Sequence, residues 1–254
     1  VASGLETFDL KAEGAAISFD SMQEAYKKSF THNTFAKGIK VTREALRDEL
    51  YGPAKRCAAE LGRTAKYTKN VQAMSVFNDA TSAAIYTLNG VSPTLLSATH
   101  QLVSTGTWSN KFASATDLSP ESLELGLIQF ESNMPDHRGR PQMVMPKFLV
   151  CGVSNRFVAR RLLETKQGRP FSNMNDVNVL LDYDLELIVM HHMNDDGRWF
   201  IVGPPGETGL RYWDRESLTV ETDKEPNTGD MLYRAFFAES HGATHPIGLF
   251  GSSA

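Results

Sequence analysis

The sequence has few cysteines, no excess of basic charge and no long apolar run. Its only two cysteines, Cys57 and Cys151, lack a CxxC or histidine partner at metal-site spacing, so we expect small buried residues there. A net charge of -4 provides no basic footprint for tight nucleic-acid binding. No apolar stretch approaches the roughly 20 residues that span a bilayer, and no signal sequence opens the chain. We therefore expect a soluble protein without a membrane partner.

Complete catalytic motifs are also lacking. The stretch from Gly203 to Gly209 resembles the opening of a phosphate-binding loop, but Leu210 and Arg211 follow it where that loop needs a lysine and a helix. A second group of residues has types that are found in hydrolases: Glu239, Ser240, His241 and His245. The sequence has no nucleophile elbow, and no base positioned by an acid can be recognised near a nucleophile. We expect neither nucleotide binding nor hydrolysis.

One local cluster carries metal-ligand residue types: His191, His192, Asp195 and Asp196. Adjacent histidines on a strand point to opposite faces and cannot share one ion without distortion. The segment from Asn194 to Gly197 has the composition of a hairpin turn. We expect no metal, cofactor or catalytic site, and a metal-dependent enzyme remains the lesser alternative.

The longest segment without strand signals runs from Thr42 to about Asp79. Thr42 is a plausible N-cap, and the pair Gly52-Pro53 predicts a break between a short helix and a long one, because proline suits a first helical turn. After Pro53, small and apolar residues recur at helical spacing, opposite a mostly basic face. The apolar positions are Ala54, Cys57, Ala58, Leu61 and Ala65, and the basic ones are Lys55, Arg56, Arg63, Lys66 and Lys69.

The first 41 residues have too little apolar content for a compact domain. Strand-like pieces at Glu6 to Leu10 and Ile17 to Phe19 flank a turn at residues 11–14, which predicts an extended hairpin. Such a hairpin is marginal in water unless it lies on something else. It is either an edge hairpin of the same domain or an arm on a neighbouring subunit.

The rest of the chain mixes helices and strands. Residues 80–115 read as loops and short strands. We predict a helix capped by Asp117 or Ser119 with Pro120 at its first position, and a second helix over about 156–165 that Gly168 ends. An apolar run from Met143 to Val150 separates these two helices.

Strand patterns dominate the last third. Residues 185–190 read as a strand buried on both faces, forming a hairpin with residues 198–202. Further strands are predicted at 210–213, 217–220 and 232–238, before a Gly- and Ser-rich end.

A series of short segments carries a resemblance to a known family. One is residues 24–52, EAYKKSFTHNTFAKGIKVTREALRDELYG. The others, in chain order, are His100 with Gly106, Ser109-Asn110, Asp117-Leu118-Ser119 with Ser122-Leu123, residues 138–141, 146–150, 175–178 and 185–189, Asp195-Asp196 with Trp199, and Gly251-Ser252. Together they resemble the major head (capsid) proteins of tailed bacteriophages, most closely the Mu-type major head subunit group. The resemblance covers nearly the whole chain.

This resemblance implies an α+β chain with the Hong Kong 97-type capsid fold. In that fold an N-terminal arm and extended loop, here residues 1–41, reach across neighbouring subunits. Residues 42–119 would form a peripheral domain around the long spine helix. Residues 120–235 would form a central axial domain of mixed α/β structure, and residues 236–254 a C-terminal segment packing back on the domains.

The function implied is that of a non-enzymatic major capsid protein, which self-assembles into the icosahedral head shell and encloses double-stranded DNA. Its partners would be copies of itself in hexamers and pentamers, with cement or decoration proteins, portal and scaffold as further candidates, and no cofactor. It would lie in the virion capsid, assembled in the host bacterial cytoplasm. An encapsulin-type nanocompartment shell is the main alternative. The expected intersubunit contacts are Phe8, Lys11, Phe19, Tyr26, Phe30, Lys55, Arg56 and Arg63.

Overall fold

The computed structural model describes residues 7–14, 16–20, 28–48, 52–85, 87–88, 91–103, 106–136, 138–165 and 178–252. The chain divides into two compact units. Unit 1 comprises Val1–Lys28, Asn78–Leu210 and Ala243–Ala254, and unit 2 comprises Ser29–Phe77 and Arg211–Gly242. In the part of the chain that is described, no helix is long and apolar enough to cross a membrane.

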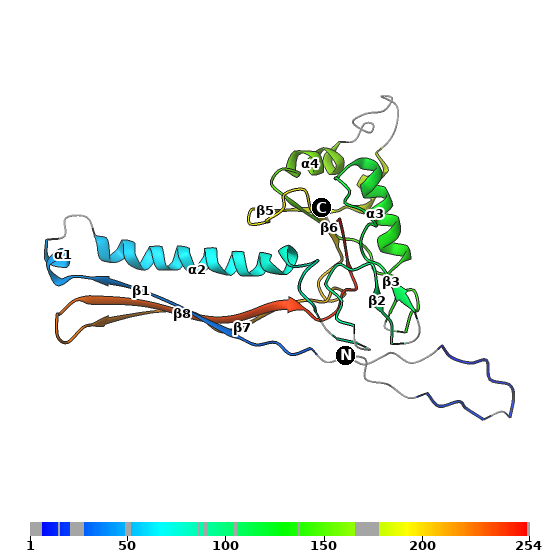
Figure 1. The fold of residues 1–254 in the computed structure, drawn as a ribbon, viewed down its shortest axis with the longest axis horizontal. Helices are drawn as coiled ribbons and strands as arrows, with labels where there is room; N and C mark the ends of the chain where they lie inside the picture. The colour runs from blue at the N-terminus through cyan, green and yellow to red at the C-terminus, as the bar shows by residue number, and fades with distance from the viewer. Residues whose placement is uncertain are drawn as a thin grey trace. The chain divides into compact units, whose positions relative to one another are not determined.

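Unit 2 is built on a three-stranded sheet of long strands. Strand β1 (Asn33–Val41) lies at one edge, β8 (Met231–Ala243) in the centre and β7 (Leu210–Lys224) at the other edge. β1 and β8 pair antiparallel, from Asn33 opposite Glu239 to Val41 opposite Met231. Segments about 200 residues apart in sequence therefore lie side by side, as the blue and orange strands in Figure 1 show.

Two helices follow β1. Helix α1 (Arg43–Arg47) begins after the N-cap Thr42, whose hydroxyl accepts a hydrogen bond from the Ala45 N–H at 3.3 Å. Helix α2 (Pro53–Asn78) has 26 residues, so its axis is about 39 Å long. Gly52 precedes it with a φ of 68°, a left-handed conformation that glycine adopts readily. The prediction of a short helix, a break at Gly52-Pro53 and a long helix is confirmed.

The apolar face of α2 packs on the sheet of unit 2. Leu61 is only 2% exposed and forms a cluster with Tyr233 and Ala235 of β8. Partly buried residues complete this cluster: Ile39, Val41, Cys57 and Met231. Ala65, one turn after Leu61, is also buried. The predicted apolar face is thus confirmed where side chains are described, and it fixes the long helix to β1 and β8.

Unit 1 contains a four-stranded sheet in the order β5-β4-β6-β9. Its strands are β4 (Phe148–Gly152), β5 (Glu186–Met190), β6 (Trp199–Val202) and β9 (Leu249–Gly251). β5 runs parallel to β4, whereas β6 is antiparallel to both β4 and β9.

This sheet corrects two predictions. The expected hairpin between residues 185–190 and 198–202 is wrong, because β4 lies between β5 and β6. The expectation that β5 is buried on both faces is also wrong, since β5 is an edge strand and Ile188 is 38% exposed. β4 and β6 hold the two central positions, and β4 is buried from Leu149 to Gly152. Sequence proximity suggested a hairpin, but β4, which is distant in sequence, pairs with both β5 and β6.

Helices cover the sheet of unit 1. Helix α3 (Pro120–Ser132) contacts β6 and β9, and α4 (Arg156–Glu164) contacts β4, β5 and the short 3₁₀ helix η1 (Val179–Tyr183). Ser119 caps α3 in a capping box with Ser122, and Pro120 stands in the first turn, as predicted. The predicted stop of α4 at Gly168 lies outside the described residues. Residues 80–115 contain only short strands within the described part, β2 (His100–Gln101) and β3 (Thr107–Trp108).

The N-terminal segment also differs from expectation, and the two compact units have other bounds than the predicted domains. Residues 7–14 and 16–20 contain no strand, so the predicted hairpin strands are wrong there, and β1 pairs with β8 instead. The units divide near residues 28, 77, 210 and 242, whereas the predicted domains divide at 41, 119 and 235. The physical reason is that a strand pairing across about 200 residues leaves no local signal in the sequence.

Candidate functional site

The segment from residue 7 to residue 20 presents large apolar side chains that its own chain leaves uncovered. Phe8, Leu10 and Phe19 are fully exposed, and Ile17 is 66% exposed. The Ser18 hydroxyl donates a hydrogen bond to the Asp9 carboxylate at 2.8 Å. A soluble protein seldom exposes such a series unless it binds another surface. We call residues 7–20 the arm.

The arm also has a turn and charged side chains. Gly14 has a φ of 75° at the turn between the two limbs of the arm, and Lys11 is exposed just before this turn. Asp20 forms an ion pair with Arg138 at 3.4 Å, both within unit 1. Three carboxylates, Asp9, Glu13 and Asp20, stand against one lysine in the described arm, so the arm is acidic as well as apolar.

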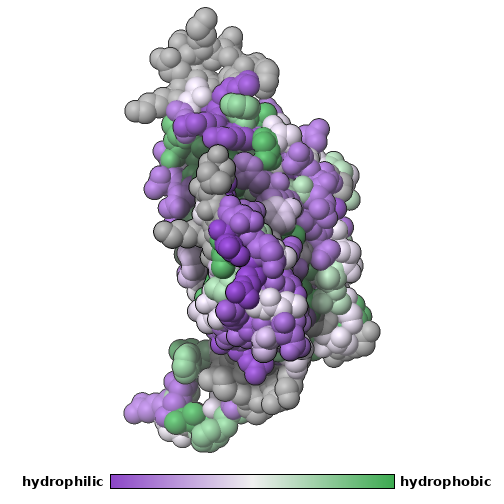
Figure 2. All heavy atoms as spheres, turned by 90° about the vertical axis from the view of Figure 1, so that its left-hand side faces the viewer, coloured by the Kyte–Doolittle hydropathy of each residue, from purple (hydrophilic) through white to green (hydrophobic). Residues whose placement is uncertain are grey.

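A shallow hollow on unit 2 has the opposite charge. It has a volume of about 510 Å³ and is lined by Ile39, Arg56, Cys57, Ala59, Glu60 and Arg63, from β1 and α2. Arg56 and Arg63 are exposed, and Arg63 pairs loosely with Glu60 at 3.5 Å. Away from such hollows, hydrophilic residues predominate over the face seen in Figure 2, with hydrophobic residues in small separate patches. We call this hollow the α2 groove.

The predicted contact residues thus fall into different places. Phe8, Lys11 and Phe19 lie on the exposed arm, and Arg56 and Arg63 line the α2 groove. Phe30 is partly buried in unit 2, with its ring centroid 4.2 Å from that of Trp213 and its ring against Gly242. Tyr26 and the side chain of Lys55 lie outside the described part of the chain.

The residue types that suggested hydrolase chemistry have other partners. The Glu239 side chain is buried and accepts a hydrogen bond from the Tyr212 hydroxyl at 3.0 Å, while the Lys69 ammonium lies 3.4 Å away. Burial lowers the pKa of Lys69, but its hydrogen bond to Tyr212 and the charges of Glu239 and Asp214 outweigh this effect and raise that pKa. The arrangement is a structural ion pair of unit 2. No local pattern in the sequence links Lys69 to Glu239, because the two residues meet only through the packing of α2 on the sheet.

The metal-ligand types at residues 191–196 form a turn. In the described chain no three His, Cys, Asp or Glu side chains lie close enough to hold a metal ion. The Asp195 carboxylate accepts the Gly197 N–H at 3.1 Å, and the Asp196 carbonyl accepts a hydrogen bond from the Ser154 hydroxyl at 2.8 Å. A turn is present as predicted, but it is not the turn of a hairpin, and its polar groups bind the adjacent loop before α4.

The glycine-rich stretch before β7 is also explained by packing. No helix follows it, because Leu210 opens β7 as predicted. A Cβ atom on Gly209 would lie 1.9 Å from the His245 carbonyl oxygen, so glycine is needed for this close backbone approach. Thr244 donates its backbone N–H to the Gly209 carbonyl at 2.8 Å. These contacts give the glycines a structural role.

A buried polar pair stabilises the loops of unit 1. Asn110 is fully buried, and its side-chain oxygen accepts hydrogen bonds from the Ser97 N–H at 2.9 Å and from His100 Nε2 at 2.8 Å. Its side-chain nitrogen donates to the carbonyls of Leu95 and Leu249. Because Nε2 must carry the proton, His100 Nδ1 is the unprotonated nitrogen, and it is buried without a partner. Protonation would therefore place an unpaired charge in the core.

We expect acid to destabilise unit 1 through His100. Burial lowers the pKa of His100 from 6.5 to about 4, although the Asn110 hydrogen bond opposes this shift. Since the unfolded state binds the proton first, the free energy of unfolding falls as the pH drops from about 6.5 to about 4, by about 3 kcal/mol in total. Urea unfolding at several pH values would measure this. The variant His100→Gln keeps an N–H donor but does not titrate, so its pH dependence should be shallower; equal slopes would contradict the assignment.

Solved structures share this fold. The capsid of cyanophage P-SCSP1u matches with a TM-score of 0.59 at 10% identity, covering 100% of this chain and 83% of that chain. The capsid of Ralstonia phage GP4 matches with a TM-score of 0.58 at 11% identity, covering 100% and 82%. The capsid of a native GTA particle matches with a TM-score of 0.58 at 12% identity, covering 100% and 84%. The fold is therefore the α+β, Hong Kong 97-type fold of phage capsid subunits.

A family model described as phage capsid protein matches residues 25–250, and the chain belongs to this family. No curated protein sequence matches the chain. The protein is a major capsid protein, a structural and non-enzymatic subunit whose copies form the phage head shell in the virion. This membership favours the predicted head protein over both alternatives, the encapsulin-type shell and the metal-dependent enzyme.

Proposed function

We propose that the shell encloses double-stranded DNA and is built from hexamers and pentamers in which the arm of each subunit clasps a neighbour. The observation that carries this proposal is the arm itself, with its four large apolar side chains exposed to solvent. Copies of the chain are the only partners that a homo-oligomeric shell always supplies. Heterologous contacts repeated around symmetry axes close such a shell.

The α2 groove of the neighbouring copy is the proposed docking place for the arm. The groove offers apolar side chains, including Ile39 and Cys57, between two exposed arginines. The arm offers Phe8 and Phe19 next to carboxylates. Apolar residues at the centre of a contact with complementary charges at its rim are typical of specific interfaces. This gives Arg56 and Arg63 the role of contacts for an acidic neighbour, with Lys11 nearby on the arm.

The remaining assignments follow from the resemblance to the Mu-type major head group, in which we propose to place the chain. Residues 42–119, with α2 as the spine, would be the peripheral domain, residues 120–235 the axial domain, and residues 236–254 a C-terminal segment packing back on the domains. Portal, scaffold and cement proteins are the further proposed partners, with assembly in the host bacterial cytoplasm. A net charge of -4 suits a container that must not bind its contents tightly.

Electron microscopy of the purified protein tests this function. We expect the full-length chain to form closed particles, and particles isolated from phage-producing cells to contain nuclease-protected double-stranded DNA. Recombinant subunits that stay monomeric at every concentration would contradict self-assembly. Particles filled with a protein cargo in place of DNA would contradict the proposed contents.

A further inference from the structure

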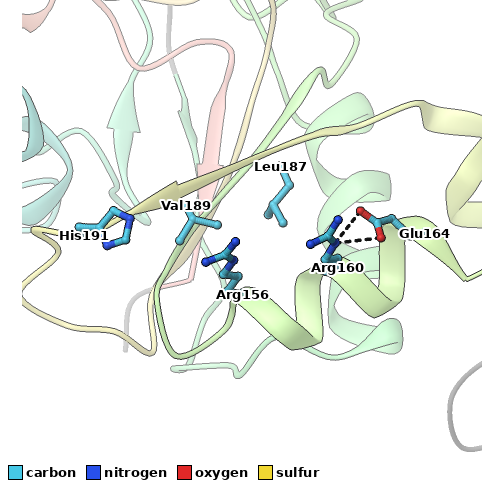
Figure 3. Close-up of a pocket in the computed structure, with 6 residues that line it drawn as sticks. All are labelled: Arg156, Arg160, Glu164, Leu187, Val189 and His191. Atoms are coloured by element: carbon cyan, nitrogen blue, oxygen red, sulfur yellow. Dashed lines mark hydrogen bonds and ion pairs between the residues drawn. The ribbon is translucent and has the colours of Figure 1, made fainter.

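A second hollow lies on unit 1, between α4 and the edge strand β5. It has a volume of about 390 Å³ and is lined by Arg156, Arg160, Glu164, Leu187, Val189 and His191. Figure 3 shows the two arginines rising from α4 on one side and Leu187 and Val189 on β5 on the other. Leu187 and Val189 are partly buried against the core, so they form an apolar floor. We call this hollow the α4 hollow.

The charge at the rim of the α4 hollow is mainly positive. The Arg160 guanidinium lies 2.8 Å from one Glu164 carboxylate oxygen and 2.9 Å from the other, so Arg160 is already paired. Arg156 is exposed at the start of α4, and its guanidinium has no hydrogen-bond or ion-pair partner among the described residues. His191 adds a third basic group at the end of the hollow. An apolar floor beside an unpaired arginine fits a partner that is apolar in the middle and acidic at its margins.

The outer face of α3 has these properties. Leu125 and Ile128 are 54% and 60% exposed, whereas Leu123, Leu127 and Phe130 on the inner face are buried. Glu121 and Glu131 are exposed and lie on the same outer stripe, four residues before Leu125 and three after Ile128. The outer face is therefore an apolar pair between two carboxylates. We call Glu121, Leu125, Ile128 and Glu131 the α3 ridge.

The α3 ridge and the α4 hollow lie over different strands of the unit 1 sheet. α4 contacts β4 and β5, and α3 contacts β6 and β9 of the sheet ordered β5-β4-β6-β9. A chain therefore does not cover its own hollow with its own ridge. A second copy can do so, and its own hollow then stays open for a third copy, which is the head-to-tail geometry that forms rings.

We propose that the α3 ridge of one copy docks into the α4 hollow of the next copy, with Leu125 and Ile128 on the apolar floor and one of the flanking carboxylates near Arg156. The partner is a second copy of this chain because the protein forms a homo-oligomeric shell and both halves of the contact lie on one subunit. This inference rests on the proposed function. It adds a contact within unit 1 that is independent of the arm and the α2 groove.

Charge reversal at Arg156 tests the contact. In Arg156→Glu a carboxylate would face the ridge carboxylates, and we expect the protein concentration needed for assembly to rise about tenfold or more. Arg161→Glu is the matched control, since Arg161 is exposed on the same helix but does not line the hollow. The control should assemble as the wild type does. Sedimentation and negative-stain microscopy measure assembly, and circular dichroism checks that each variant is folded.

Recovery of assembly by a charge swap tests whether the α3 ridge occupies the α4 hollow. We expect Glu121→Lys/Glu131→Lys to weaken assembly as Arg156→Glu does, and the combination of all three changes to recover at least half of the lost assembly. If Arg156→Glu assembles like the wild type, the α4 hollow is not a contact. If both reversals weaken assembly but their combination does not recover it, the α3 ridge is not the occupant. If the wild type itself forms no particles, it is the proposed function that fails.

Discussion

The variant Leu61→Asp is expected to abolish folding of unit 2. Leu61 is 2% exposed and packs on Tyr233 and Ala235, in a cluster that joins α2 to β8. Removing a buried leucine side chain costs about 2–5 kcal/mol, and a carboxylate without a partner at the same place adds its desolvation. Whole domains are stable by only about 5–15 kcal/mol. We therefore expect loss of the cooperative unfolding transition, measured by circular dichroism and urea titration.

The control for this prediction is Asn70→Asp. It places a new carboxylate on the same helix, at an exposed position and with almost no change in shape. Its unfolding midpoint should stay close to that of the wild type. A folded Leu61→Asp subunit with wild-type stability would show that α2 does not depend on the sheet.

Local signals explain why the helices could be predicted from the sequence. Thr42, Gly52-Pro53, Ser119 and Pro120 each act within one helical turn, through a hydrogen bond or a fixed backbone angle, and each stands where expected. The spacing that placed Leu61 and Ala65 on one face is equally local. Such signals require no knowledge of the rest of the chain.

The strand pairings were not predictable in this way. β1 meets β8 across about 200 residues, and β4 intervenes between β5 and β6. Both arrangements depend on contacts between segments that are distant in sequence. The ion pair between Lys69 and Glu239 likewise joins residues that are distant in sequence. Of the candidate contacts, Phe8, Lys11, Phe19, Arg56 and Arg63 are exposed, as a contact between subunits requires. No local pattern in the sequence indicates that Phe30 packs on Trp213, because the two residues are far apart in the chain.

Deletion of residues 1–28 is expected to leave a folded subunit that no longer forms closed particles. A deletion to residue 35 would also remove Phe30, His32 and the start of β1, which belong to unit 2, so the cut at residue 28 is cleaner. Burying a large apolar side chain contributes about 1.5–3 kcal/mol, so the four exposed residues of the arm represent on the order of 6 kcal/mol or more per subunit in a clasping contact. Light scattering and negative-stain microscopy measure the loss.

Point variants separate the contact from any effect of removing chain. Phe8→Ser/Phe19→Ser keeps the arm at full length, and because both side chains are fully exposed, the isolated subunit should unfold at the wild-type midpoint while assembly is lost. Thr7→Ser/Ala12→Ser changes two exposed positions of the same segment without altering its large apolar or charged side chains, and it should still assemble. Because the arm has no cover in its own chain, only a contact with another copy makes the phenylalanines matter. Normal shells from both the deletion and the phenylalanine variant would show that the arm is not the clasp.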